Sequence, residues 1–101
     1  MPQVRLCRLD AVPRGEPKQF NAGETEVLVV SRDGRFYCLT ARCTHAGAPL
    51  EEGRLEGDVL ICPWHGSRFR VTDGSVLGGP AVRPLRQYPS TVRDGYLFVE
   101  V

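Results

Sequence analysis

The stretch CTHAGAPLEEGRLEGDVLICPWHGSRF, residues 43–69, contains two short clusters of cysteine and histidine. The first cluster is CTH (residues 43–45) and the second is CPWH (residues 62–65), with sixteen residues between them. Together they contain both histidines of the chain and two of its four cysteines. Each cluster offers one thiolate and one imidazole on a tight turn, so the pattern indicates a metal centre held between two loops.

The spacing of these ligands narrows the choice of metal. Zinc modules usually group their ligands as C-x-x-C or as a cysteine pair followed by a histidine pair, and four-cysteine iron–sulfur sites contain no histidine. The pattern here suits a [2Fe–2S] cluster in which Cys43 and Cys62 bind one iron and His45 and His65 bind the other. A single zinc ion bound by the same four residues is the physical alternative. A chance grouping of buried thiols and surface imidazoles is another.

Residues 43–50 and 62–69 closely resemble the two cluster-binding boxes of Rieske proteins, and the resemblance covers essentially the whole chain. The sequence is similar to the small Rieske ferredoxins that carry electrons in bacterial aromatic-ring oxygenase systems. It is also similar to the small Rieske subunit of assimilatory nitrite reductases. The resemblance implies one Rieske-type [2Fe–2S] cluster per chain, bound by the two cysteines and two histidines named above.

Three further residues enter the site through this resemblance. Ser67 stands where high-potential members place a hydroxyl that donates to sulfur, although capping its own turn is an equal alternative. Pro80 resembles the proline of a loop that covers the cluster from a third side, where a plain turn is the alternative. Trp64 lies between two ligands, where it would shield the cluster, meet a partner or only pack.

The potential expected of the cluster follows from what the boxes lack. High-potential members have a tyrosine donor where this chain has Phe69, and a disulfide between the positions occupied here by Ala48 and Trp64. Without that tyrosine and disulfide, we expect a midpoint potential in the lower part of the Rieske range, which extends from about −150 to +300 mV.

The turn residues predict an all-β fold. Asp33-Gly34 and Asp94-Gly95 are each flanked by apolar or β-branched segments, as in β-hairpins. The hairpins would pair residues 26–30 with 35–40 and 90–93 with 96–101, and residues 55–61 predict another turn leading into the second cluster. Eight prolines and eleven glycines interrupt any helical period.

The resemblance refines this prediction to a Rieske-type β-sandwich base with an inserted cluster-binding subdomain. At 101 residues, the chain would form a single domain, residues 1–101, with the subdomain at about residues 41–82.

Composition excludes several classes of partner. A net charge of +1, with 42% hydrophobic and 25% charged residues, is ordinary for a globular protein and predicts no nucleic-acid partner. No apolar run suits a signal peptide or a membrane span, so we expect a cytoplasmic protein that does not bind membranes. Cys7 and Cys38 lie outside the clusters and are expected to be small buried hydrophobes; a disulfide between them is the alternative that a reducing compartment disfavours.

These observations predict an electron carrier rather than an enzyme. As the resemblance implies, it would take one electron from a flavin-containing reductase and pass it to a terminal oxygenase, meeting both transiently as a monomer. A self-contained oxygenase needs a second iron site of two histidines and a carboxylate, and both histidines are already used. A nitrite reductase subunit and a zinc-stabilised interaction module are the alternatives. Arg42, Arg68 and Arg70 bracket the clusters, where they would attract an acidic partner; the alternative is that they have no measurable effect, as is usual for isolated surface arginines.

Overall fold

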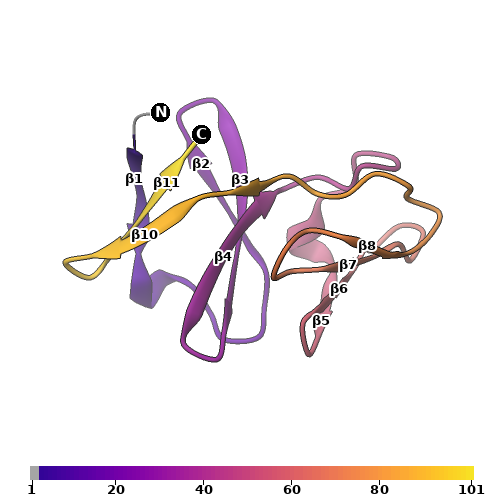
Figure 1. The fold of residues 1–101 in the computed structure, drawn as a ribbon, viewed down its shortest axis with the longest axis horizontal. Coiled ribbons are helices and arrows are strands. Elements are labelled where there is room, and N and C mark those ends of the chain that lie inside the picture. The colour runs from indigo at the N-terminus through magenta and orange to yellow at the C-terminus, as the bar shows by residue number, and fades with distance from the viewer. Residues whose placement is uncertain (1–2) are drawn as a thin grey trace.

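The computed structural model describes residues 3–101, which form three antiparallel sheets (Figure 1). The first sheet has the order β1-β11-β10, with strands Gln3–Arg8, Tyr96–Glu100 and Ser90–Arg93. The second has the order β2-β3-β4-β9, with strands Lys18–Ala22, Thr25–Arg32, Arg35–Thr40 and Gln87–Tyr88. The third has the order β5-β6-β7-β8, with strands Arg54–Glu56, Val59–Ile61, Arg68–Arg70 and Val76–Gly78. Two 3₁₀ turns, η1 (Leu9–Ala11) and η2 (Leu50–Glu52), complete the fold, and the all-β prediction is confirmed.

Two Asp-Gly dipeptides form the tight hairpins that the sequence predicts. Asp33 and Gly34 have φ values of 53° and 76° between β3 and β4, and Asp94 and Gly95 have φ values of 54° and 79° between β10 and β11. Positive φ at both central residues is the signature of a type I′ turn, whose twist matches that of the paired strands. The third predicted turn is also present, because β5 and β6 pair on either side of residues 57–58.

A third Asp-Gly dipeptide, Asp73-Gly74, lies in the longer connection between β7 and β8. Gly74 has a φ of 79°, and its N–H donates to the Arg70 carbonyl at 2.7 Å. Its own carbonyl accepts from the Leu85 N–H at 2.8 Å. A Cβ atom at this position would collide with the Leu85 carbonyl oxygen, so only glycine fits without a shift of the backbone. Gly74 therefore joins the β7–β8 turn to the segment that returns to the base.

Strand β3 separates two apolar cores. The first core, called the base core, lies between β3 and the first sheet, and the second core lies between β3 and the third sheet. Val27 and Val29 pack with residues of the first sheet, whereas Leu28 and Val30 pack with residues of the third. Successive strand residues point to opposite faces, so a strand covered on both sides reads as an unbroken apolar run. In Figure 1 this strand lies between β1, β10 and β11 on one side and β5 to β8 on the other.

The second core lies directly beneath the two predicted metal-binding loops. It joins β3 and β4 to the third sheet and includes Cys43 and Cys62 themselves. Its largest fully buried side chains are Phe69, Leu28, Leu39, Leu50, Leu60, Val30 and Val71. The ligand loops are thus seated on packed hydrophobic side chains, which limits their movement.

The two cysteines outside the clusters are free thiols. Cys38 is buried in the base core, and burial raises its pKa to about 11, so the thiol stays protonated at neutral pH. Cys7 is only partly buried, so the expectation of a fully buried residue is wrong for it. It lies on β1, where the register with β11 shifts between Arg5 and Cys7. Within residues 3–101, no helix has the length and apolar character needed to cross a membrane.

Candidate metal centre

The first ligand loop, residues 43–48, follows β4. The Cys43 N–H donates to the Ala48 carbonyl at 2.9 Å, and the Gly47 N–H donates back to the Cys43 carbonyl at 2.9 Å. Gly47 has a φ of 74°, which lets the chain reverse within six residues. The loop therefore closes through its own backbone and presents the side chains between Cys43 and Gly47 outward.

The second ligand loop, residues 62–67, repeats this geometry between β6 and β7. The Cys62 N–H donates to the Ser67 carbonyl at 2.8 Å, and the Gly66 N–H donates to the Cys62 carbonyl at 3.2 Å. Gly66 has a φ of 77°. In both loops a glycine four residues after the cysteine makes the reversal, although the histidine stands at the second position in one loop and at the third in the other.

The four ligand candidates come together as two like pairs. Cys43 and Cys62 are 4% and 3% exposed and belong to the same core cluster. His45 and His65 are exposed, with ring centroids 5.1 Å apart and ring planes at 84°. The thiols are thus buried and the imidazoles lie at the surface of the protein. In Figure 1 the second loop connects β6 and β7, at the end occupied by the third sheet.

The environment of Cys62 contains opposing influences on its ionisation. Burial raises the pKa of the thiol, and the nearby Cys43 thiol raises it as well. The backbone N–H groups of Trp64 and His65 donate to its sulfur and lower the pKa. A bound metal would supply the positive charge that stabilises the Cys62 thiolate, and the N–H groups of the loop would add to this stabilisation.

This arrangement fits a two-iron cluster. Among residues 3–101, no three His, Cys, Asp or Glu side chains surround one point closely enough to hold a single metal ion. A [2Fe–2S] cluster instead needs two separate pairs, one of thiolates and one of imidazoles. The buried cysteine pair and the exposed histidine pair match that requirement in donor type and in number.

Ser67 is the one fully buried polar side chain among the described residues. Its Oγ accepts the Ala81 N–H at 3.0 Å, a contact that the sequence does not reveal. That bond uses a lone pair of the hydroxyl and leaves its proton for another acceptor. Within residues 3–101, no hydrogen bond donated by this hydroxyl to a protein atom accompanies the one it accepts, so its proton is free for another acceptor.

The segment around Pro80 is held against both ligand loops. Ala81 is buried and bonded to Ser67, and the Thr44 hydroxyl donates to the Arg83 carbonyl at 2.6 Å. Val82, between these two fixed points, is 87% exposed. The sequence analysis did not single out Thr44. Its hydroxyl, between the two ligand candidates Cys43 and His45, was the signal that could have identified it. The segment around Pro80 therefore borders both loops, as expected of a loop that covers the centre from a third side.

Trp64 is 56% exposed, so it does not serve as a core residue. Arg68 and Arg70 are exposed on the outer side of β7. The Arg42 guanidinium is bonded to Glu26 and to the Gly47 carbonyl, contacts that the sequence did not reveal. Arg42 and Glu26 are 16 positions apart in the sequence, so spacing alone did not pair them.

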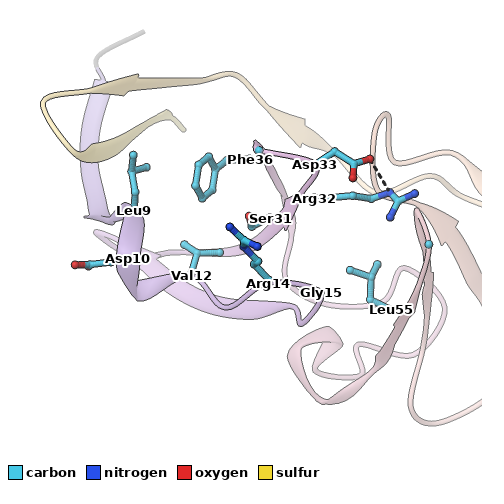
Figure 2. A pocket seen from close by; sticks show the side chains of 12 residues that line it. Leu9, Asp10, Val12, Arg14, Gly15, Ser31, Arg32, Asp33, Phe36 and Leu55 are labelled. Carbon is cyan, nitrogen blue, oxygen red and sulfur yellow. Dashed lines mark ion pairs between the residues drawn. The ribbon is translucent and has the colours of Figure 1, made fainter.

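A hollow of about 640 Å³ lies away from the ligand loops (Figure 2). It is bordered by η1, the β3–β4 turn and the β5–β6 turn, with Val12, Phe36 and Leu55 among its apolar residues. Arg32 and Asp33 form a loose ion pair at 3.9 Å on its rim. No ligand candidate lines it, so the metal centre and this hollow are separate features.

Known proteins resemble this chain in sequence and in fold. The Rieske [2Fe–2S] domain model matches residues 3–89. The 3-phenylpropionate/cinnamic acid dioxygenase ferredoxin subunit of Photorhabdus laumondii is 31% identical, covering 100% of this chain and 96% of the relative. The ferredoxin of Sphingomonas yanoikuyae B1 superposes with a TM-score of 0.93 at 30% identity, covering 99% of both chains. A chain in a complex of oxygenase and ferredoxin from carbazole 1,9a-dioxygenase gives 0.87 at 32% identity, covering 96% of this chain and 91% of that one.

Proposed function

Because this chain belongs to the Rieske [2Fe–2S] domain family, we propose that it is the ferredoxin component of a ring-hydroxylating dioxygenase system and carries single electrons to the oxygenase. The observation that carries the proposal is the division of the ligands, with two cysteines buried and two histidines exposed at one end. Its relatives are named as ferredoxin subunits, which transfer electrons and do not catalyse the oxygenation. A nitrite reductase subunit is not favoured by these relatives.

The residues have distinct parts in this function. Cys43 and Cys62 would hold one iron, and His45 and His65 the other. The bound cluster supplies a centre that gains and loses one electron. Burial of the two cysteines excludes water from the sulfur side, and the exposed imidazoles offer the shortest route to a partner. The cluster-binding unit would comprise about residues 41–82 of a single domain.

The end that carries the histidines also suits contact with an oxygenase. Trp64 in the second ligand loop and Val82 in the segment around Pro80 are exposed apolar side chains, and exposed aromatic residues are frequent interface anchors. Residues 41–50, 62–68 and 78–86 contain no Asp or Glu. The oxygenase–ferredoxin complex of carbazole 1,9a-dioxygenase supports an oxygenase partner. A flavin-containing reductase as donor, a monomeric state and a cytoplasmic location complete the proposal, from the family resemblance.

The proposal is tested by low-temperature EPR of the dithionite-reduced protein, with iron and acid-labile sulfide assayed on the same sample. We expect two irons and two sulfides per chain and a rhombic signal whose average g value lies below that of the free electron, as mixed nitrogen and sulfur ligation produces. A colourless, EPR-silent protein with stoichiometric zinc would establish the zinc module instead. Stable co-purification with one large partner would favour the subunit alternative.

Ser67 provides a second test, through its hydroxyl proton. We expect Ser67→Ala to lower the midpoint potential by about 20–60 mV, because a neutral hydrogen bond contributes about 0.5–1.5 kcal/mol and 59 mV corresponds to a tenfold change in a one-electron equilibrium. A bond to sulfur favours the more negative, reduced state, so its loss favours oxidation. Protein-film voltammetry measures the shift, with Ser75→Ala as control because the Ser75 hydroxyl donates to Asp73. An unchanged potential in Ser67→Ala would leave Ser67 with a structural role only.

A further inference from the structure

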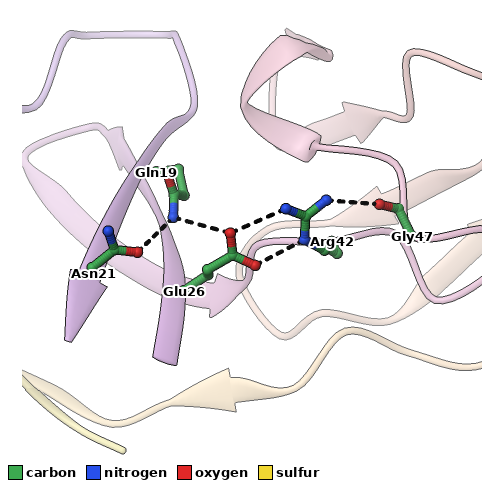
Figure 3. Close-up of polar contacts among 5 residues, drawn as sticks. All are labelled: Gln19, Asn21, Glu26, Arg42 and Gly47. Atoms are coloured by element: carbon green, nitrogen blue, oxygen red, sulfur yellow. Dashed lines mark hydrogen bonds and ion pairs between the residues drawn. The ribbon is translucent and has the colours of Figure 1, made fainter. Parts of the chain in front are cut away.

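The loop that carries His45 is tied to the base by a bidentate ion pair. Arg42 directly precedes Cys43, and Glu26 lies near the start of β3 (Figure 3). The Arg42 Nε donates to Glu26 Oε1 at 2.8 Å, and Nη2 donates to Oε2 at 3.1 Å. Two parallel bonds of this kind fix both the distance and the orientation of the two groups.

The same guanidinium also holds the far side of the loop. Arg42 Nη1 donates to the Gly47 carbonyl at 3.2 Å. The Gly47 N–H is bonded to the Cys43 carbonyl, so both neighbouring peptide groups of this glycine are restrained. One side chain therefore connects β3 to the last turn of the first loop, across the segment that contains His45.

The second loop has no need of such a connection. It is enclosed by β6 and β7, where Ile61 and Arg68 are paired in the sheet. The first loop has β4 before it but only the 3₁₀ turn η2 after it, and its flanks meet in one isolated bridge between Arg42 and Pro49. The contacts of the Arg42 side chain supply the support that a strand ladder gives to the second loop.

The local network makes this pair stronger than an average surface ion pair. Isolated exposed pairs contribute little to stability, whereas bidentate pairs within a network are the exception. Gln19 Nε2 bonds to Asn21 Oδ1 at 2.8 Å and approaches Glu26 Oε2 at 3.5 Å, so the carboxylate is also supported from β2. The hydrogen bond from Arg42 lowers the pKa of Glu26, and the carboxylate therefore stays ionised at neutral pH.

We propose that Glu26 and Arg42 are positioning residues that hold the first ligand loop on the base sheet and thereby fix His45 relative to His65. The ring contact between the two histidines, 5.1 Å between centroids, depends on the placement of both loops. Because the pair is exposed, its effect should weaken at high salt. This inference rests on the proposed function only where it concerns the bound cluster; the support of the loop itself stands independently.

The test compares Arg42→Lys and Glu26→Gln with Arg54→Ala in the cluster-loaded protein. Arg42→Lys keeps the positive charge but loses the bidentate geometry and the bond to Gly47, so a change in this variant reports position rather than charge. Arg54→Ala is the matched control, because Arg54 forms an exposed ion pair with Glu56 at 2.7 Å and, among residues 3–101, its side chain is hydrogen-bonded to neither ligand loop.

We expect Arg42→Lys and Glu26→Gln to lose iron to a chelator about two- to fivefold faster than the wild type at low salt, and to broaden the EPR lines that report histidine geometry. Hydrogen exchange measured by mass spectrometry should be faster in the peptide covering residues 41–50 and unchanged in that covering residues 60–69. Arg54→Ala should match the wild type in all three measurements.

The proposal is overturned if Arg42→Lys has the EPR line shape, iron loss and exchange of Arg54→Ala. Equal acceleration of exchange in both loops would also contradict it, because general destabilisation would explain that result. A wild-type protein without an iron–sulfur signal would refute the proposed function. The loop-specific exchange would still decide whether Glu26 and Arg42 support the first loop, so the two failures are distinguishable.

Discussion

Cys62→Ala should abolish the iron–sulfur centre, whereas Cys38→Ala should leave it fully assembled. Both cysteines are buried, so burial alone does not separate them. Cys62 lies beside Cys43 and accepts two backbone N–H groups that favour a thiolate. Cys38 lies in the base core, where burial raises its pKa to about 11 and keeps the thiol protonated. Burial raises the pKa of Cys62 as well, so the two thiols differ in their neighbours rather than in their ionisation. Cys62 has Cys43 beside it as a second thiol in a ligand loop, and a bound metal would stabilise the thiolate form.

The measurement is iron and acid-labile sulfide per chain, together with visible absorption, for both variants purified in parallel. We expect almost complete loss of both elements in Cys62→Ala and wild-type content in Cys38→Ala. Circular dichroism shows whether each variant has kept its β-structure, which separates ligand loss from unfolding. Retention of two irons in Cys62→Ala, or their loss from a folded Cys38→Ala, would overturn the ligand assignment.

Gly74→Ala should destabilise the protein far more than Gly95→Ala, although both glycines have a φ of 79°. The shared cost of a left-handed alanine is about 1–2 kcal/mol. At Gly95 nothing lies close to the added Cβ, so only that cost applies. At Gly74 the Cβ would also collide with the Leu85 carbonyl oxygen, and a forced backbone shift adds about 1–3 kcal/mol.

Urea unfolding followed by circular dichroism gives the two free energies of unfolding. We expect losses of about 2–5 kcal/mol for Gly74→Ala and about 1–2 kcal/mol for Gly95→Ala. The difference between the variants isolates the contact with Leu85, since the backbone strain is common to both. Equal losses would mean that residues 74 and 85 adjust freely, and that the link between the β7–β8 turn and the returning chain is weak.

Local signals in the sequence were enough to predict the hairpins but not every strand. Asp33-Gly34 and Asp94-Gly95 provide two consecutive residues that tolerate positive φ, so the turn type follows from the dipeptide. Asp73-Gly74 has the same composition but bonds to Arg70 and to the distant Leu85. The short strands β7, β8 and β9 have two or three residues each and exist because of their partners across the sheet, which no local pattern reveals.

In the metal site, too, the sequence predicted the residues but not the long-range contacts that hold them. Spacing and side-chain chemistry singled out the four ligand candidates, and the structure brings them together in two pairs. The contacts that hold the loops are long-range ones, between Glu26 and Arg42, Thr44 and Arg83, and Ser67 and Ala81. Each joins residues 14 or more positions apart, so their partners become visible only after the chain has folded.

The position of β3 between the two cores has a consequence for cooperativity. Neighbouring residues of this strand face opposite cores, so the strand cannot leave one core without exposing the other. The base and the metal-bearing end should therefore unfold as one unit, and the amides of β3 should exchange only through global opening. In an electron carrier, the geometry around the centre is then stabilised by the whole molecule and not by the loops alone. The structural rearrangement that accompanies each electron transfer therefore stays small.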